Sequence, residues 1–143
     1  MGDQNTFSFP AEVKLVFSFL EEYGFHCQAT SQQKVRYESD TVYLEITHGG
    51  WDGEISIAFG RIALKEEFSF TLFLRSVNPS LEKALGERLA FEPDQIISCL
   101  KGLGAALLDD GRSILLAEEA VFDRMKDVRW WDFEPDALKK KPE

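Results

Sequence analysis

The chain has 143 residues, the size of one ordinary domain. Hydrophobic residues make up 44% of it and aromatic residues 13%, so it can bury one continuous core, and intrinsic disorder is not expected outside its ends. The net charge of −9 argues against a nucleic-acid partner, because an acidic surface repels phosphate backbones.

Targeting signals are not evident in the sequence. The opening MGDQNTFSFP has neither the basic region nor the apolar core of a secretory signal. No window approaches the roughly 20 apolar residues of a membrane span. We therefore expect a soluble cytoplasmic protein without a membrane partner, in which Cys27 and Cys99 are reduced and buried.

The first element predicted is an amphipathic helix of about 12 residues. Pro10 suits its first turn, where the missing N–H is not needed, and Gly24 suits its C-terminal stop. Its apolar side chains recur at helical spacing: Val13, Val16, Phe17 and Leu20.

The period then changes to two. Residues 25–30, 34–38, 42–47 and 54–59 alternate between apolar and polar side chains, with turn residues at 39–40 and 49–53. This pattern predicts a four-stranded antiparallel meander with one buried face. Cys27 falls on the buried parity of the first strand. Trp51 lies at the predicted hairpin tip, where an aromatic ring is available to a partner.

Residues 68–77 fit two structures. Phe68, Phe70, Leu72 and Leu74 fit a strand, whereas Phe70, Phe73, Leu74 and Val77 fit a helix. The pattern alone leaves both open, and Asn78-Pro79 ends the segment in either case.

The last third of the chain is predicted to be helical. Pro93-Asp94 opens a run with an apolar stripe, which ends at Asp109-Asp110-Gly111. A second run places Leu115, Phe122 and Met125 on one face and Glu118, Glu119 and Asp123 outside it. The fold class predicted is therefore α+β: an N-terminal helix, a four-stranded antiparallel meander sheet, and C-terminal helices packed on one face. Residues 1–129 form one domain, and residues 130–143 form a C-terminal tail.

No residue pattern predicts a catalytic, cofactor or metal site. His26 and His48 lack the spacing of zinc ligands, and His26 and the adjacent Cys27 point to opposite faces of a strand. The HGGWDGE segment matches neither a P-loop nor GxGxxG, so a hairpin turn explains it better.

The residues singled out for partner binding are aromatic and acidic. They are Trp51, Asp109, Asp110, Glu118, Glu119, Trp130 and Trp131. Large aromatic side chains serve as interface anchors, and carboxylates steer a basic partner. Trp130 and Trp131 have two interpretations, fold-back onto the core or an exposed contact patch, of which we favour fold-back.

One resemblance follows from residues 35–61, VRYESDTVYLEITHGGWDGEISIAFGR, with FSFTLFLRSV and the LLDDG helix junction after them. Residues 8–127 resemble a family of small uncharacterised bacterial proteins, in which a YESDxVYLEI-like strand pair precedes an arm ending in Phe-Gly. The resemblance implies the fold, favours helix for residues 69–77, and brings no activity. Size, charge and fold type also make the chain similar to immunity proteins of bacterial toxin systems, by analogy only.

Three hypotheses about function follow. The first is a non-enzymatic cytoplasmic protein-interaction domain, including an immunity-type protein that neutralises a basic toxin. The second is a small-molecule-binding domain or enzyme with a pocket between sheet and helices, in which His26 or His48 supplies the polar group. The third is a homodimer formed through an exposed sheet edge or the aromatic tail.

Overall fold

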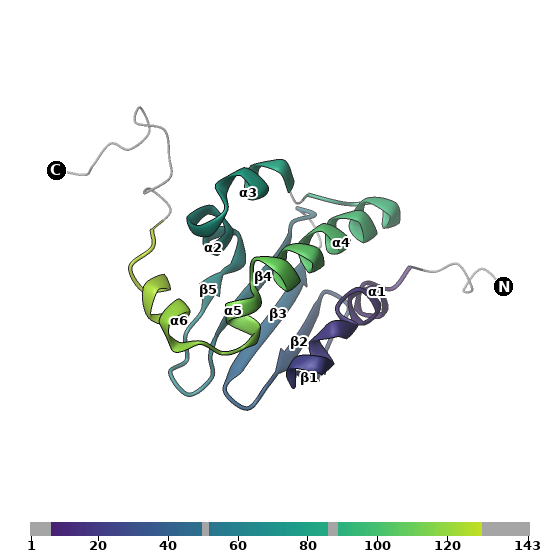
Figure 1. Cartoon of the computed structure of the whole chain (residues 1–143). Helices are drawn as coiled ribbons and strands as arrows, with labels where there is room; N and C mark the ends of the chain where they lie inside the picture. Colours follow the sequence, from purple (N-terminus) through teal and green to yellow (C-terminus); the bar gives the residue numbers. More distant parts are fainter. Residues whose placement is uncertain (1–6, 50–51, 86–88, 130–143) are drawn as a thin grey trace.

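The protein has two layers, a five-stranded antiparallel sheet and a set of helices that cover one of its faces (Figure 1). The computed structural model describes residues 7–49, 52–85 and 89–129. The strands follow the chain order β1-β2-β3-β4-β5, so the sheet is a simple meander. This confirms the α+β class and the placing of the helices, with a short fifth strand added to the four predicted.

The N-terminal helix is shorter than predicted. Helix α1 spans Phe9–Val16, where the side-chain oxygen of Ser8 accepts a hydrogen bond from the backbone N–H of Ala11 at 3.3 Å. The chain continues as a 3-10 helix, η2 (Ser18–Tyr23), and stops at Gly24, whose φ of 86° suits glycine. The start and the stop are therefore as predicted. The prediction of one regular helix of about 12 residues is wrong, because the segment divides into an α-helix and a 3-10 helix.

The long strands are those that the alternation predicts. They are β1 (His26–Thr30), β2 (Lys34–Glu38), β3 (Val42–His48) and β4 (Ile55–Arg61). The β3–β4 hairpin pairs His48 with Ile55, and its turn uses Gly53 at φ 71°. Strand β1 differs from the prediction because all five of its residues are exposed. The predicted burial of Cys27 is therefore wrong, because β1 is an edge strand with a bulge between Cys27 and Ala29.

Both alternatives for residues 68–77 hold in part. Phe68–Ser69 forms the short strand β5, which pairs with β4, and the chain then enters helix α2 (Phe70–Val77). The side chain of Ser69 caps this helix by accepting a hydrogen bond from the backbone N–H of Leu72 at 3.2 Å. The helical alternative is therefore correct from Phe70 onward.

The remaining helices are α3 (Pro79–Leu85), α4 (Pro93–Asp109), α5 (Arg112–Leu115) and α6 (Glu119–Met125). Helix α4 is the longest element, and the side chain of Gln95 caps it by accepting hydrogen bonds from the backbone of Phe91 and Glu92. The second predicted run divides into α5 and α6 at Ala117, whose φ of 57° is left-handed and breaks the helix.

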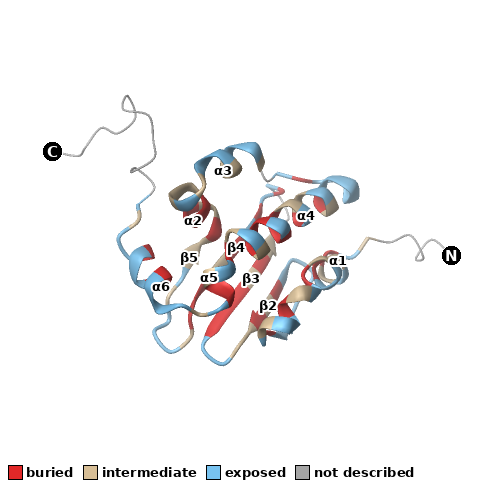
Figure 2. Ribbon diagram, viewed as in Figure 1, coloured by how far each residue is buried: buried red, intermediate tan, exposed pale blue. Residues whose placement is uncertain are grey.

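The core lies between the two layers. The inward sides of the helices and the middle strands are buried, and the outward sides of the helices are exposed (Figure 2). Phe59 on β4 is fully buried, and its ring contacts those of Phe68, Phe73 and Phe122 at centroid distances of 5.7, 6.1 and 5.9 Å. One aromatic side chain thus joins the sheet to α2 and α6.

Replacing Phe59 by alanine is expected to lower the free energy of unfolding by about 3–5 kcal/mol, because it leaves a cavity between three rings. Urea unfolding measures the loss. Leu64→Ala is the control, because Leu64 is 57% exposed and its truncation costs within about 0.5 kcal/mol. Equal losses in the two variants would contradict this picture of the core.

Candidate functional site

The first pair of acidic residues predicted to bind a partner lies at the end of α4. Asp109 is exposed. Asp110, the C-cap residue, is half-buried, and its Oδ1 accepts a hydrogen bond from Nδ2 of Asn78 at 3.3 Å. Asp109 is therefore available to a partner, whereas Asp110 also connects α4 to the loop after α2.

The second acidic pair lies at the start of α6 and divides in the same way. Glu118 is the exposed N-cap residue. Glu119 has a side chain that is 78% exposed, but its Oε1 accepts a hydrogen bond from a terminal nitrogen of Arg61 at 2.5 Å. Glu119 thus takes part in the fold. The other predicted contacts, Trp51, Trp130 and Trp131, lie outside the described residues.

Arg61 is the centre of the most connected polar group that the structure describes. Its guanidinium donates to both carboxylate oxygens of Glu66, at 2.8 and 2.6 Å, and also to Glu119 and Asp123. The ring of Phe122 lies 5.3 Å from the guanidinium carbon. Three carboxylates around one buried cation join the end of β4 to the turn before β5 and to α6.

The Arg61 group shifts the pKa values of its members. Hydrogen bonds from Arg61 lower the pKa of Glu66, and those to Glu66 raise the pKa of Arg61, both away from neutral pH. Lys126 approaches Glu66 and Asp123 at 4.0 Å. With every charge paired, this group suits a structural role better than proton transfer.

The sequence did carry a signal for Arg61. It occupies the parity of Ile55, Ile57 and Phe59 on β4, so a charge falls where the alternation calls for an apolar side chain. A charge on a buried face needs partners, because desolvating it alone is costly. The partners themselves, on a turn and on α6, could not be read from the pattern.

The opposite sheet face carries a second polar group, and the helices that the structure describes pack on the other face. Arg36 pairs with Glu38 at 2.7 Å and with Glu45 at 2.8 Å, and it lies over the ring of Tyr43 at 4.1 Å. The Tyr43 hydroxyl donates to the backbone oxygen of Glu66 at 2.7 Å. Burial, with nearby carboxylates, raises the pKa of Tyr43 to about 12. These charges balance one another, which suits a solvated sheet face.

The two histidines lie far apart in the fold. His48 sits beside the ring of Phe9, at 5.6 Å between centroids, with Nε2 2.7 Å from the backbone oxygen of Ala90. His26 is exposed and borders a shallow recess that includes Tyr23 and Asp40. Within residues 7–49, 52–85 and 89–129, no group of three or more His, Cys, Asp or Glu could hold a metal ion.

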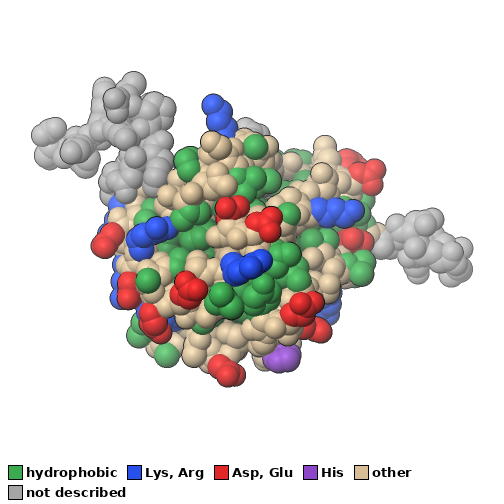
Figure 3. Space-filling view, in the orientation of Figure 1, with side chains coloured by type: hydrophobic (Ala, Val, Ile, Leu, Met, Phe, Trp, Pro, Cys, Tyr) green, Lys and Arg blue, Asp and Glu red, His purple; other side chains and the backbone are tan. Residues whose placement is uncertain are grey.

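A groove with a mostly apolar lining lies between α1 and α4. It measures about 600 Å³. Leu15 is 70% exposed at its edge, and small residues of α4, Gly104 and Ala105, form part of its wall. An added Cβ at Gly104 would lie 3.1 Å from Val16, so glycine allows the two helices to approach closely. Hydrophobic side chains gather on this helical side of the molecule (Figure 3).

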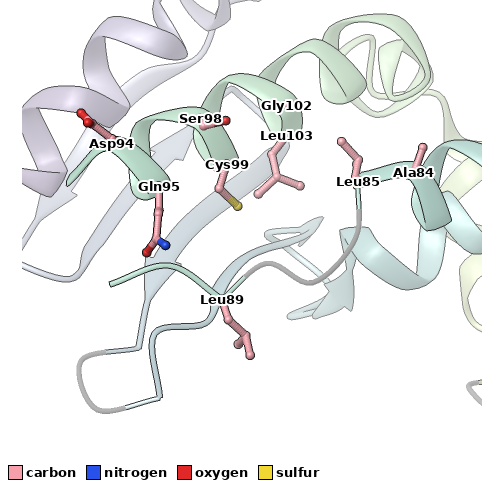
Figure 4. Close-up of a pocket in the computed structure, with 9 residues that line it drawn as sticks. All are labelled: Ala84, Leu85, Leu89, Asp94, Gln95, Ser98, Cys99, Gly102 and Leu103. Atoms are coloured by element: carbon pink, nitrogen blue, oxygen red, sulfur yellow. The ribbon is translucent and has the colours of Figure 1, made fainter. Parts of the chain in front are cut away.

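A second groove lies between α3 and α4 and is more polar (Figure 4). It measures about 580 Å³, and Ser98, Cys99 and Gln95 point toward it from α4. The oxygen of Gln95 is already used in capping α4. Neither histidine lines this groove or the one between α1 and α4.

Comparisons with known proteins give no assignment. No family model matches the chain, and neither a curated protein nor a solved structure matches it. The resemblance of residues 8–127 to a bacterial family therefore stays a prediction. No helix of the described part of the chain is long and apolar enough to cross a membrane.

Glu66 is expected to make the stability of the protein sensitive to acid. Its folded pKa lies below its unfolded value of about 4.3, so its contribution is complete above that pH and is lost as the pH falls through the folded pKa. In urea unfolding measured from pH 6 to pH 2, the free energy of unfolding of the native protein should fall, and that of Glu66→Gln should fall less. The control is Glu67→Gln, at an exposed neighbouring position, whose free energy of unfolding should fall as far as that of the native protein. Identical curves for all three proteins would refute this role.

Removing members of the Arg61 group is expected to destabilise the protein in a fixed order. Arg61→Met should lower the thermal midpoint most, because it leaves the buried Glu66 carboxylate without its main partner. Glu119→Gln should cost at most about 1 kcal/mol, because Glu119 is largely exposed. Glu118→Gln is the matched control and should have no effect; calorimetry that ranks it with Arg61→Met would contradict the assignment.

Proposed function

We propose that this protein is a non-enzymatic protein-interaction domain that binds a basic partner in the groove between α1 and α4. The observation that carries the proposal is an apolar groove exposed on a molecule of net charge −9. Its volume is about 600 Å³, and the side chain of Leu15 at its edge is 70% exposed.

The shape of the groove favours a helix as the part of the partner that binds. It runs between two helices, and its apolar side chains occur on both: Leu15 and Val16 on α1, and Ile97 and Leu108 on α4. An amphipathic helix places its own apolar residues at positions i, i+4 and i+7, which match a linear groove of this kind.

Glu12 and Lys101 line the groove and balance each other, but the elements that border it are acidic, which favours a basic partner. The bordering elements α1, η2 and α4 carry five carboxylates against two lysines: Glu12, Glu21, Glu22, Asp94 and Asp109, with Lys14 and Lys101. Such a surface accelerates encounter with a basic protein, and apolar contacts then hold the complex. Asp109, one of the acidic residues singled out from the sequence, belongs to this set.

A basic toxin is one partner of this chemistry, and the protein would then act as its immunity-type inhibitor. Burying an apolar helix of a toxin requires no catalytic group on this chain. The cytoplasmic location is part of the same proposal.

Binding of a small molecule in the groove between α3 and α4 is the second candidate. Its support is the mixed lining of Ser98, Cys99 and apolar side chains. Because neither histidine lines the groove, this candidate replaces the version in which His26 or His48 supplies the polar group. Ligand-induced shifts of the Cys99 resonances would support it, and shifts unchanged by Ser98→Tyr would refute it.

Site-directed crosslinking tests the proposed function. A photoreactive residue at position 15 should capture a basic protein in the source cell, whereas the same residue at position 64, also exposed but distant, should not. The captured protein, once purified, should bind the native chain in calorimetry, and more weakly as salt rises.

A matched pair of variants locates the contact. Ala105 and Ala120 are both exposed alanines on helices, but only Ala105 lines the α1–α4 groove. Ala105→Arg should weaken binding of the purified partner at least tenfold, because it fills the groove and repels a basic surface. Ala120→Arg should change it little. Equal effects, or binding insensitive to salt, would contradict the proposal.

A further inference from the structure

The surface between α2, α5 and α6 has a third groove, much smaller than the other two. It measures about 290 Å³ and is lined by Phe73, Val77, Asp110, Ala120, Val121 and Arg124, together with Ser113. Val77 is 39% exposed, so apolar surface reaches solvent here. The groove has room for one large side chain, not for a helix.

Three features of this groove match the chemistry of an indole ring. Val77 and Ala120 offer apolar surface to the ring. Arg124 also lines the groove, its guanidinium donates a hydrogen bond to Oγ of Ser76 at 3.4 Å, and a cation held in this way can stack on an aromatic face. Asp110 has a half-buried carboxylate, and its one described hydrogen bond uses Oδ1. Its remaining acceptor capacity suits the indole N–H, which needs a partner when buried.

The sequence supplies two such side chains shortly after α6. Helix α6 ends at Met125, and the chain turns directly after it, with the N–H of Asp127 bonded to the oxygen of Arg124 at 3.0 Å. The N–H of Val128 is bonded in turn to the oxygen of Met125 at 3.2 Å, and Trp130 follows Val128 by two residues, a span of at most about 7 Å. Residues 130–143, which lie outside the described residues, begin with Trp130 and Trp131.

We propose that a tryptophan of the Trp130–Trp131 pair docks intramolecularly into the groove between α2, α5 and α6, with its ring against Val77 and Ala120 and its N–H directed at Asp110. The C-terminal segment then packs on α6 and α2. This inference is independent of the proposed function, which concerns a different groove. It assigns Asp110 an intramolecular role and leaves Asp109 for the partner.

Tryptophan fluorescence tests the proposal on the full chain. The protein has three tryptophans, so Trp51→Phe leaves Trp130 and Trp131 as the only emitters. In this variant the emission maximum should lie at shorter wavelength than in the same protein unfolded by guanidinium, and iodide should quench it less. Emission and quenching equal to those of the unfolded chain would overturn the proposal.

Two further substitutions in the Trp51→Phe protein locate the docking site. Ala120→Glu should abolish the blue shift and restore iodide quenching, because it places a carboxylate over the groove, four residues before Arg124. Ala105→Glu, in the α1–α4 groove, should leave both unchanged. A shift lost only with Ala105→Glu would place the tail in the other groove, and a shift that grows with protein concentration would mean docking between copies. Either result overturns the proposal.

Circular dichroism and Asp110→Asn complete the test. Ala120 is exposed, so the Ala120→Glu variant should keep the helical signal of its parent. Asp110→Asn weakens an acceptor without filling the groove, and it should reduce the blue shift in part. A full blue shift in both groove variants would show that the ring is buried elsewhere, against the proposal.

Discussion

A sheet with one apolar face is the constraint on which the rest of this structure depends. Val35, Leu44, Ile57 and Phe59 point to the same side, and burial of each is worth about 1.5–3 kcal/mol only while helices exclude water from it. The cover comes from both ends of the chain: α1 from the start, and α2 to α6 from the second half. Where α1 meets α4 the cover is complete at the core but leaves an apolar groove outside, and this is the surface to which we assign binding.

The polar interactions that the structure describes hold this cover in place. Arg61 ends the buried side of β4 and ties the β4–β5 turn and α6 to it through three carboxylates, so the last described helix depends on a charge as well as on Phe122. Because the carboxylate of Glu119 binds Arg61, not every carboxylate on α6 is available to a partner. The proposed contacts move instead toward Leu15 on α1 and Asp109 at the end of α4.

Much of the fold could be predicted from the sequence, because period two in the strands and helical spacing elsewhere reflect one-sided burial directly. The prediction failed where the burial or backbone conformation of a residue depends on its position in the fold and not on the local sequence pattern. Cys27 has the parity of a buried residue but lies on the edge strand β1, all of whose residues are exposed. Ala117 takes a left-handed conformation that no local signal announces. For the candidate site, the sequence indicated acidic residues as candidates but could not indicate the groove, because Leu15 and Ala105 lie 90 positions apart and meet only through packing of α1 on α4.

Methyl NMR of the full chain can show whether the α1–α4 groove binds a basic amphipathic helix, as we propose. The chain is titrated with a synthetic helical peptide of leucine and lysine. We expect shifts concentrated at Leu15, Ile97 and Leu108, which weaken with added salt and do not occur with a peptide in which glutamate replaces lysine. Shifts that spread evenly over exposed methyl groups such as those of Leu64, or that ignore the sign of the peptide charge, would contradict it.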